Sequence, residues 1–159
     1  MTQRVYLETS VISYLTALPS RDLLVAGHQQ VTREWWDKRT RFGLYVSEAV
    51  VQEVSRGDAG AAARRIEALQ GLAILASAPQ ALELARSFLA TATIPGKAAI
   101  DALHVALAAV HGMDFLLTWN CTHIANAALR PQLEELCWRA GFRPPIICTP
   151  LELMEENES

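Results

Sequence analysis

The stretch Val5-Tyr6-Leu7-Glu8-Thr9-Ser10 decides the fold of this 159-residue sequence. Its first part, with the preceding Arg4, predicts a strand over Arg4–Leu7. A continuous apolar run of this kind is typical of a strand in a sheet that is covered on both faces. The Thr-Ser pair can then cap a short helix over Val11–Leu15. A buried strand that passes directly into a helix predicts an α/β protein, with an acidic residue, Glu8, at the junction.

The rest of the chain repeats this alternation of strand and helix. Four further strands are predicted at Gly43–Val46, Leu72–Ala76, Asp114–Thr118 and Ile146–Cys148. Helices are predicted from Arg21 to about Arg39, from Ser47 to the break at Arg56-Gly57-Asp58, over Ala59–Gln70, from Pro79 to about Leu89, from Pro95 to about His111, and over Pro131–Ala140. Such alternation implies parallel pairing through right-handed crossovers.

Composition predicts one domain over residues 1–159, with a short acidic tail from about residue 152. Hydrophobic residues make up 51% and charged residues 19%, and the net charge is −3. There is therefore no overall basic signature for nucleic acid, and a polyanionic partner would need a local basic patch or a bound metal ion. Three widely spaced cysteines and no evident leader peptide predict a cytoplasmic protein. The longest apolar stretch is too short and too polar for a membrane span, so no membrane partner is expected.

Four oxygen-bearing side chains stand out by their positions: Glu8, Glu53, Asp101 and Asn120. Glu8 and Asn120 each follow a predicted strand, and Asp101 interrupts an otherwise apolar helix. In open parallel sheets, sites form beyond the carboxyl ends of the strands. Carboxylates are costly to bury unless a positive charge lies between them. A divalent cation that prefers oxygen ligands, such as Mg²⁺, is the simplest candidate.

Three of these residues also have a purely structural interpretation. Glu8 could stabilise the start of a helix through the helix dipole. Asn120 could simply form a turn. Asp101 could pair with Lys97, four residues earlier on the same helix.

Two further residues have equally plain alternatives. Glu53 could be a solvated helix residue, as Glu48 could be. His104, three residues after Asp101, is expected to be a hydrogen-bonded core histidine rather than a metal ligand.

Taken together, these segments resemble the PIN-domain family, especially the VapC-type ribonuclease toxins of toxin–antitoxin pairs. The resemblance extends over about residues 4 to 150. It rests on four segments in the right order: Val5–Ser10, Ser47–Glu53, Ile100-Asp101-Ala102-Leu103-His104-Val105-Ala106 and Leu116-Leu117-Thr118-Trp119-Asn120.

The resemblance implies a three-layer α/β/α fold with a central, mainly parallel sheet, and an acidic pocket that holds Mg²⁺ or Mn²⁺. The four family acids fall on Glu8, Glu53, Asp101 and Asn120. Glu8 stands where Asp is usual and reaches one methylene further, whereas Asn120 replaces an acid and loses a charge. Three carboxylates can still hold one dication, and the neighbouring His123 or Asn126 could compensate for the change at Asn120.

The resulting hypothesis is a metal-dependent endoribonuclease that acts as a toxin. Glu8, Asp101 and Asn120 would form the metal site, and Glu53 would orient or deprotonate the attacking water. Thr9 and Ser10, at a helix start, could hydrogen-bond a substrate phosphate. Basic residues at the pocket rim would supply the missing positive field, the candidates being Lys97, Arg56 and Arg130.

The resemblance also implies partners. These are an RNA substrate and an antitoxin protein that presents Arg or Lys to Glu8 and Asp101, and a homodimer is left open. The rival hypothesis is a PIN-like module that has lost strong catalysis and binds RNA or a protein. Asn120 and the negative net charge favour that rival, whereas the trio of carboxylates opposes it.

Overall fold

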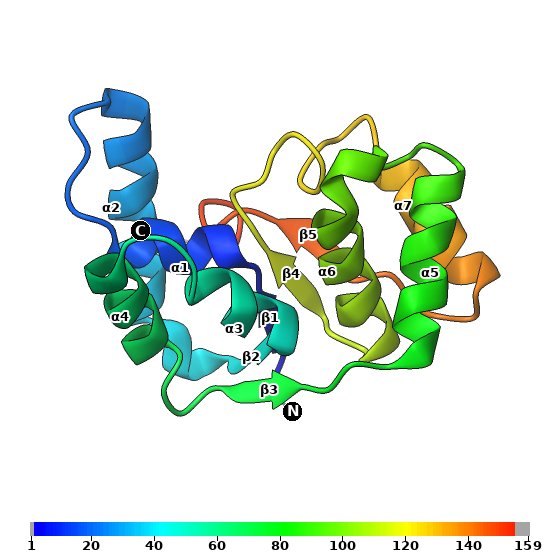
Figure 1. Ribbon diagram of the computed structural model, residues 1–159, viewed down its shortest axis with the longest axis horizontal. Coiled ribbons are helices and arrows are strands. Elements are labelled where there is room, and N and C mark those ends of the chain that lie inside the picture. The colour runs from blue at the N-terminus through cyan, green and yellow to red at the C-terminus, as the bar shows by residue number, and fades with distance from the viewer. Residues whose placement is uncertain (1, 155–159) are drawn as a thin grey trace, which may run out of the picture.

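A five-stranded parallel sheet forms the centre of the computed structural model, which describes residues 2–154 (Figure 1). The strand order is β3-β2-β1-β4-β5, and every neighbouring pair is parallel. The strands are β1 (Arg4–Leu7), β2 (Gly43–Ser47), β3 (Ala73–Leu75), β4 (Phe115–Leu117) and β5 (Ile146–Cys148). All five lie within one residue of a predicted strand, since each is a short apolar run bounded by turn residues.

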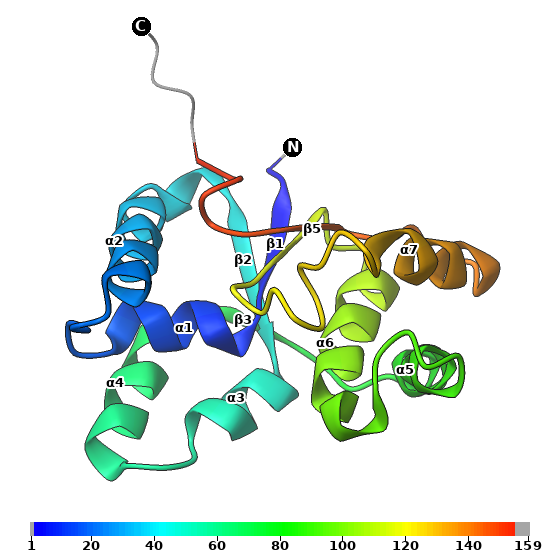
Figure 2. The ribbon, with the colours of Figure 1, turned by 90° about the horizontal axis from the view of Figure 1, so that it is seen from above.

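Helices cover both faces of this sheet, as Figure 2 shows. They are α1 (Thr9–Thr16), α2 (Leu23–Asp37), α3 (Glu48–Val54), α4 (Ala59–Ala68), α5 (Pro79–Ala90), α6 (Ala99–Val110) and α7 (Arg130–Arg139). In this view α1, α2 and α4 lie on one side of the sheet and α5, α6 and α7 on the other. Helix α3 contacts both α1 and α6. The predicted three-layer α/β/α fold is therefore confirmed.

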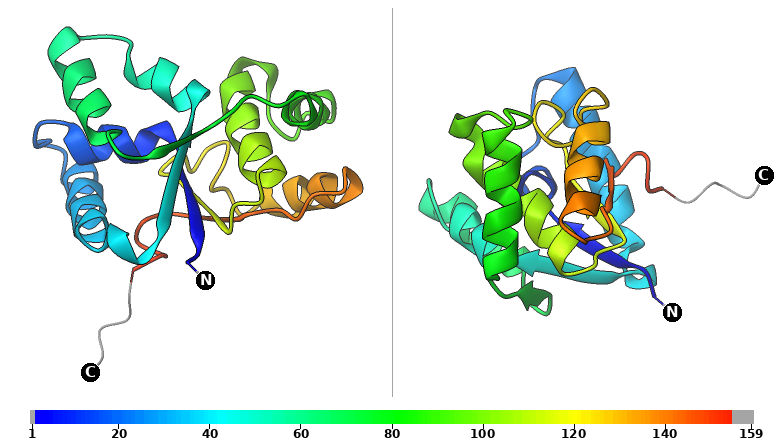
Figure 3. Two further views of the ribbon diagram at one scale, coloured as in Figure 1. Left: turned by 90° about the horizontal axis from the view of Figure 1, so that it is seen from below. Right: turned by 90° about the vertical axis from the view of Figure 1, so that its right-hand side faces the viewer.

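The order of the strands creates a switch point between β1 and β4. The chain builds outward from β1 to β2 and β3, then crosses to the other side of β1 to form β4 and β5. Figure 3 shows this return from two further directions. At such a point two neighbouring strands lead to helices on opposite faces, so a crevice opens beyond their carboxyl ends. Glu8 follows β1 there, and Thr118 follows β4.

Two local predictions were wrong. Helix α1 begins at Thr9, and its N-cap is Glu8, whose side chain accepts a hydrogen bond from the Ser10 amide; the Thr-Ser pair is already helical. The apolar helix predicted from Pro95 begins only at Ala99, after a 3₁₀ turn over Gly96–Ala98, so Asp101 lies in its first turn beside Ile100, which is 43% exposed. The buried face of α6 starts only at Ala102.

The described residues contain no helix that is long and apolar enough to cross a membrane. Of the acidic tail predicted from about residue 152, only the first part is described. Residues 151–153 form a turn there, and residues 155–159 lie outside the described range.

Candidate active site

Glu8 is a nearly buried carboxylate. All its hydrogen-bond partners among residues 2–154 are neutral groups. It is 4% exposed. Its Oε1 accepts hydrogen bonds from the Ser10 hydroxyl at 2.5 Å and the Thr118 hydroxyl at 2.6 Å, and its Oε2 accepts the Ser10 amide at 3.1 Å. Both hydroxyls come from segments that β1 and β4 bring side by side, with Leu7 opposite Leu117. A buried charge with neutral partners alone is an incomplete arrangement, which a cation would complete.

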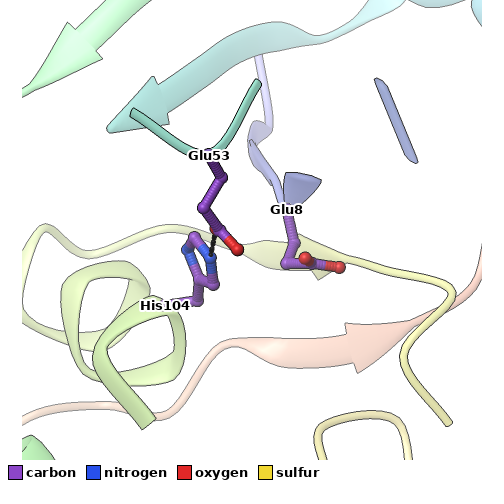
Figure 4. Close-up of side chains that lie close together, drawn as sticks. All are labelled: Glu8, Glu53 and His104. Atoms are coloured by element: carbon purple, nitrogen blue, oxygen red, sulfur yellow. Dashed lines mark hydrogen bonds and ion pairs between the residues drawn. The ribbon is translucent and has the colours of Figure 1, made fainter. Parts of the chain in front are cut away.

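Glu53 points toward the same place from α3. Its Oε1 accepts a hydrogen bond from the Thr9 hydroxyl at 2.7 Å and lies 2.5 Å from Nε2 of His104 on α6. Figure 4 shows the Glu53 carboxylate and the His104 ring facing each other, with Glu8 alongside. Ligand atoms of these three residues lie within 4.8 Å of one another. The predicted convergence of Glu8 and Glu53 is therefore present, although α1, α2 and β2 lie between them in the sequence.

The pKa of Glu53 reflects this setting. Burial raises the pKa, but the hydrogen bond and charge of His104, the Thr9 hydroxyl and the charge of Arg56 lower it by more, so the net pKa lies below the usual value. Of the three rim candidates, Arg56 is thus the one that affects this carboxylate. Arg130 instead lies 3.9 Å from Glu152. The Glu53 carboxylate is ionised at neutral pH and available as an acceptor.

His104 is completely buried and hydrogen-bonded at both ring nitrogens, as expected of a core histidine. Its Nδ1 lies 2.7 Å from the Tyr6 hydroxyl, which in turn lies 2.7 Å from the Ser47 hydroxyl. We did not predict this connection of His104 to Glu53 and Tyr6. One sequence signal was present, because Tyr6 lies two residues before Glu8 and therefore on the same face of β1.

Asp101 lies outside the cluster of Glu8, Glu53 and His104. Its Oδ2 is 3.1 Å from Nδ1 of His123, and both side chains are partly exposed, at 21% and 23%. The described contacts thus pair Asp101 with a residue after β4 and not with Lys97, which lies in the 3₁₀ turn before α6. His123 is therefore the residue that faces the third acid.

Asn120 forms a turn after β4. Its Oδ1 accepts the His123 amide at 3.0 Å, and its own amide donates to the Thr118 hydroxyl. The carbonyl of Asn120 also accepts the amides of Ile124 and Ala125. The turn-forming interpretation is thus realised, and a second lone pair of Oδ1 remains for another ligand. By fixing this turn, Asn120 places His123 beside Asp101.

Thr9 and Ser10 direct their hydroxyl hydrogens at the carboxylates of Glu53 and Glu8. The Ser10 oxygen also accepts the Trp119 amide at 2.8 Å. In the described arrangement these two side chains therefore orient the acids. Their contact with a substrate phosphate stays a prediction.

The donor set fits a hard divalent cation. Carboxylate and amide oxygens suit Mg²⁺ and Mn²⁺, and Glu8 is a nearly buried carboxylate without a cationic partner among the described residues. Glu8, Glu53 and His104 offer ligand atoms within 4.8 Å of one another, and both nitrogens of His104 are already hydrogen-bonded, so the oxygens of Glu8 and Glu53 are the grouped donors that a cation could reach.

The sequence matches the model of the PIN domain over residues 5–120. This match spans well over half of the chain, and the chain belongs to the PIN domain family. The matched range begins in β1 and ends at Asn120, so it contains all four positions that the sequence suggested. No curated protein sequence is significantly similar to the chain.

Solved structures of VapC toxins have the same fold. VapC20 of Mycobacterium tuberculosis, a toxin that cleaves the sarcin-ricin loop, superposes with a TM-score of 0.58 at 15% identity, covering 75% of this chain and 92% of its own. VapBC2 of Rickettsia felis, bound to a DNA fragment from its promoter, gives a TM-score of 0.56 at 15% identity, covering 92% and 98%. At this identity the likeness concerns the fold.

Proposed function

We propose that this protein is a metal-dependent endoribonuclease that hydrolyses RNA phosphodiester bonds, and that it is the toxin of a toxin–antitoxin pair. The observation that carries the proposal is the buried carboxylate of Glu8, without a cationic partner among the described residues, at the switch point of a PIN domain. The two similar structures, a toxin that cleaves the sarcin-ricin loop and VapBC2 bound to promoter DNA, support the same function.

Each side chain has a role in this proposal. Glu8 and Asp101 hold one Mg²⁺ or Mn²⁺, and Asn120 completes the site through its remaining lone pair or through water. When bound, the cation stabilises the negative charge that develops on the phosphate. Glu53, held by Thr9 and His104, orients the attacking water and accepts its proton. Thr9 and Ser10 lie at the start of α1, where a substrate phosphate can approach.

The antitoxin follows from the same charge argument. A partner that presents Arg or Lys to Glu8 and Asp101 would supply the missing cation and occupy the pocket at the same time. It would therefore inhibit cleavage by competing with both the metal ion and the RNA.

A cleavage assay tests the proposed activity. Purified protein is incubated with structured RNAs in Mn²⁺, in Mg²⁺ and in EDTA, beside Asp101→Asn and the matched control Asp37→Asn. Asp37 is exposed at the end of α2. Metal-dependent cleavage that Asp101→Asn removes and Asp37→Asn retains supports the proposal. A correctly folded wild type that cleaves no RNA in any metal contradicts it and favours the rival, a PIN-like module that binds RNA or a protein.

The toxin role has a separate test. Expression of the protein alone in its native host should arrest growth, and Asp101→Asn should relieve the arrest. Harmless high-level expression of the active wild type argues against a toxin, though not against a nuclease.

A further inference from the structure

A chain of buried polar side chains connects the candidate base to the interior of the fold. It runs from Ser47 at the end of β2, through Tyr6 on β1 and His104 on α6, to Glu53 on α3. The first three are at most 1% exposed. Burying such groups costs free energy that apolar residues of similar size would not incur. A fully buried polar chain that ends on a carboxylate of the site therefore needs a reason beyond packing.

Because Nε2 of His104 faces a carboxylate, it donates its hydrogen to Glu53 in either protonation state of the ring. In the neutral ring Nδ1 is then an acceptor, and the Ser47 oxygen, which accepts the Val50 amide as the N-cap of α3, can donate its hydroxyl hydrogen to the Tyr6 oxygen. The Tyr6 hydroxyl then donates to Nδ1 of His104, which leaves the Nε2 hydrogen directed at Glu53. In the neutral ring each hydroxyl and the imidazole thus have one donor and one acceptor role, and in the imidazolium both ring nitrogens donate; the Nε2 hydrogen is directed at Glu53 in both forms.

The chain also decides which oxygen of Glu53 is free. Oε1 receives both His104 at 2.5 Å and the Thr9 hydroxyl at 2.7 Å, and the described contacts of the carboxylate are all made through this oxygen. Oε2 therefore remains to accept from water. Because Ser47 caps the start of α3 and Glu53 lies near its end, the chain fixes this short helix at both ends against α6.

We infer that His104, with Tyr6 and Ser47 behind it, is the positioning residue of Glu53, which aims Oε2 at the attacking water. This inference rests on the proposed function, because it assigns Glu53 a role in cleavage. His104 itself touches neither the metal ion nor the RNA.

The test is a double-mutant cycle between His104→Leu and Glu53→Gln under single-turnover conditions. His104→Leu should lower the cleavage rate by on the order of tenfold to a hundredfold, the scale of misplacing a reacting group by about 1 Å. It should leave the KM for RNA and the Kd for Mn²⁺ unchanged. In the Glu53→Gln background the same change should cost little further, because residues that act as a unit are not additive. His104→Gln, which keeps one donor and one acceptor, should recover part of the rate.

Matched controls come from the same elements. His111→Gln changes the histidine that follows α6, whose Nε2 contacts the Ala76 carbonyl far from the site. Tyr6→Phe removes only the hydroxyl and should lower the rate less than His104→Leu does. Tyr45→Phe is its control, because Tyr45 is the register partner of Tyr6 on β2. Both controls should cleave at the wild-type rate.

Four outcomes would overturn the inference. Equal losses from His104→Leu with and without the Glu53 carboxylate would show a purely structural effect, and an unchanged rate would show that His104 does not position Glu53. Loss of Mn²⁺ affinity in His104→Leu would make His104 a metal ligand. If the folded wild type cleaves no RNA, the proposed function fails and this inference fails with it. If the wild type cleaves and Asp101→Asn does not, the proposed function stands, and a negative result with His104→Leu then counts only against the role of His104.

Discussion

Strands β1 and β4 have a carboxylate at their amino edge and another at their carboxyl edge, in opposite electrostatic settings. Asp114 lies one residue before β4, where its oxygens accept the Arg4 amide at 2.7 Å and the Arg143 guanidinium at 2.9 Å. Glu8 lies one residue after β1, with only hydroxyl and amide donors among the described residues. Yet the side chain of Asp114 is 31% exposed, whereas Glu8 as a whole residue is only 4% exposed. Among the described residues, the more buried carboxylate is therefore the one without a cationic partner.

This contrast separates structural charge from functional charge. At the amino edge, Arg4 also donates to the His111 carbonyl and stacks over the Tyr45 ring, so the whole group ties β1, β2, β4 and α6 together. At the carboxyl edge, the hydroxyls orient the acids without neutralising them. An edge that holds its negative charge in place but does not cancel it is suited to bind a cation.

The largest expected effect is on RNA cleavage. Glu8→Gln should reduce the metal-dependent rate by on the order of 10²-fold or more, the scale of losing electrostatic support of a transition state. Asp114→Asn, at the opposite edge, should leave the rate of the folded protein unchanged. Comparable losses in both variants, at a temperature where circular dichroism shows both folded, would remove the distinction between the edges.

The next effect is on stability in the presence of metal. Mn²⁺ at a hundredfold excess over its dissociation constant should stabilise the wild type by about 2.7 kcal/mol. Glu8→Gln and Asp101→Asn should lose this gain, and Asp114→Asn should keep it. Thermal melts with EDTA and with Mn²⁺ measure it, and a gain that persists in Glu8→Gln would place the ion elsewhere.

The third effect is on the pH dependence of stability, which should reveal the contribution of Asp114 at the amino edge. The Arg4 amide lowers the pKa of Asp114, and although burial opposes this, Arg143 adds to the lowering. A carboxyl whose folded pKa lies below its unfolded value stabilises the fold above the unfolded pKa, and this contribution is lost as pH falls through the folded pKa.

Asp114→Asn should therefore cost about 1 kcal/mol at neutral pH, the scale of one net hydrogen bond. This cost should shrink below about pH 4, the unfolded value for Asp. Urea unfolding at pH 7 and pH 3 measures both quantities. The lowered pKa of Glu53 predicts that this carboxylate, too, stabilises the fold less as pH falls. If the cost of Asp114→Asn grew on acidification, the lowered pKa of Asp114 would be contradicted.

The smallest effect concerns Asn120. Asn120→Asp keeps an oxygen that can accept the His123 amide and adds a negative charge to the carboxyl edge. It should tighten Mn²⁺ binding by about fivefold, equivalent to about 1 kcal/mol, and slightly destabilise the metal-free protein. Isothermal titration calorimetry checks the affinity, with Asn126→Asp as the control for added charge in the same loop. Equal tightening in both variants would show a general charge effect and not a ligand at position 120.

By itself, the sequence determined the parallel sheet and its helices, because continuous apolar runs between turn residues leave few other pairings. It also placed Glu8 and Asn120 at strand ends, since side chains just beyond a strand must lie at its edge. It predicted a buried, hydrogen-bonded His104, because a histidine on the apolar side of a helix needs partners.

Only the tertiary structure decided the partners of these groups. Helix spacing suggested Lys97 for Asp101, but the turn made by Asn120 brings His123 there instead. The link from Tyr6 through His104 to Glu53 joins a strand and two helices, and local periodicity contains no information on such contacts. The hydrogen-bond partners at the site depend on packing between elements that are far apart in the chain. These contacts contribute free energy only after the sheet has brought the elements together.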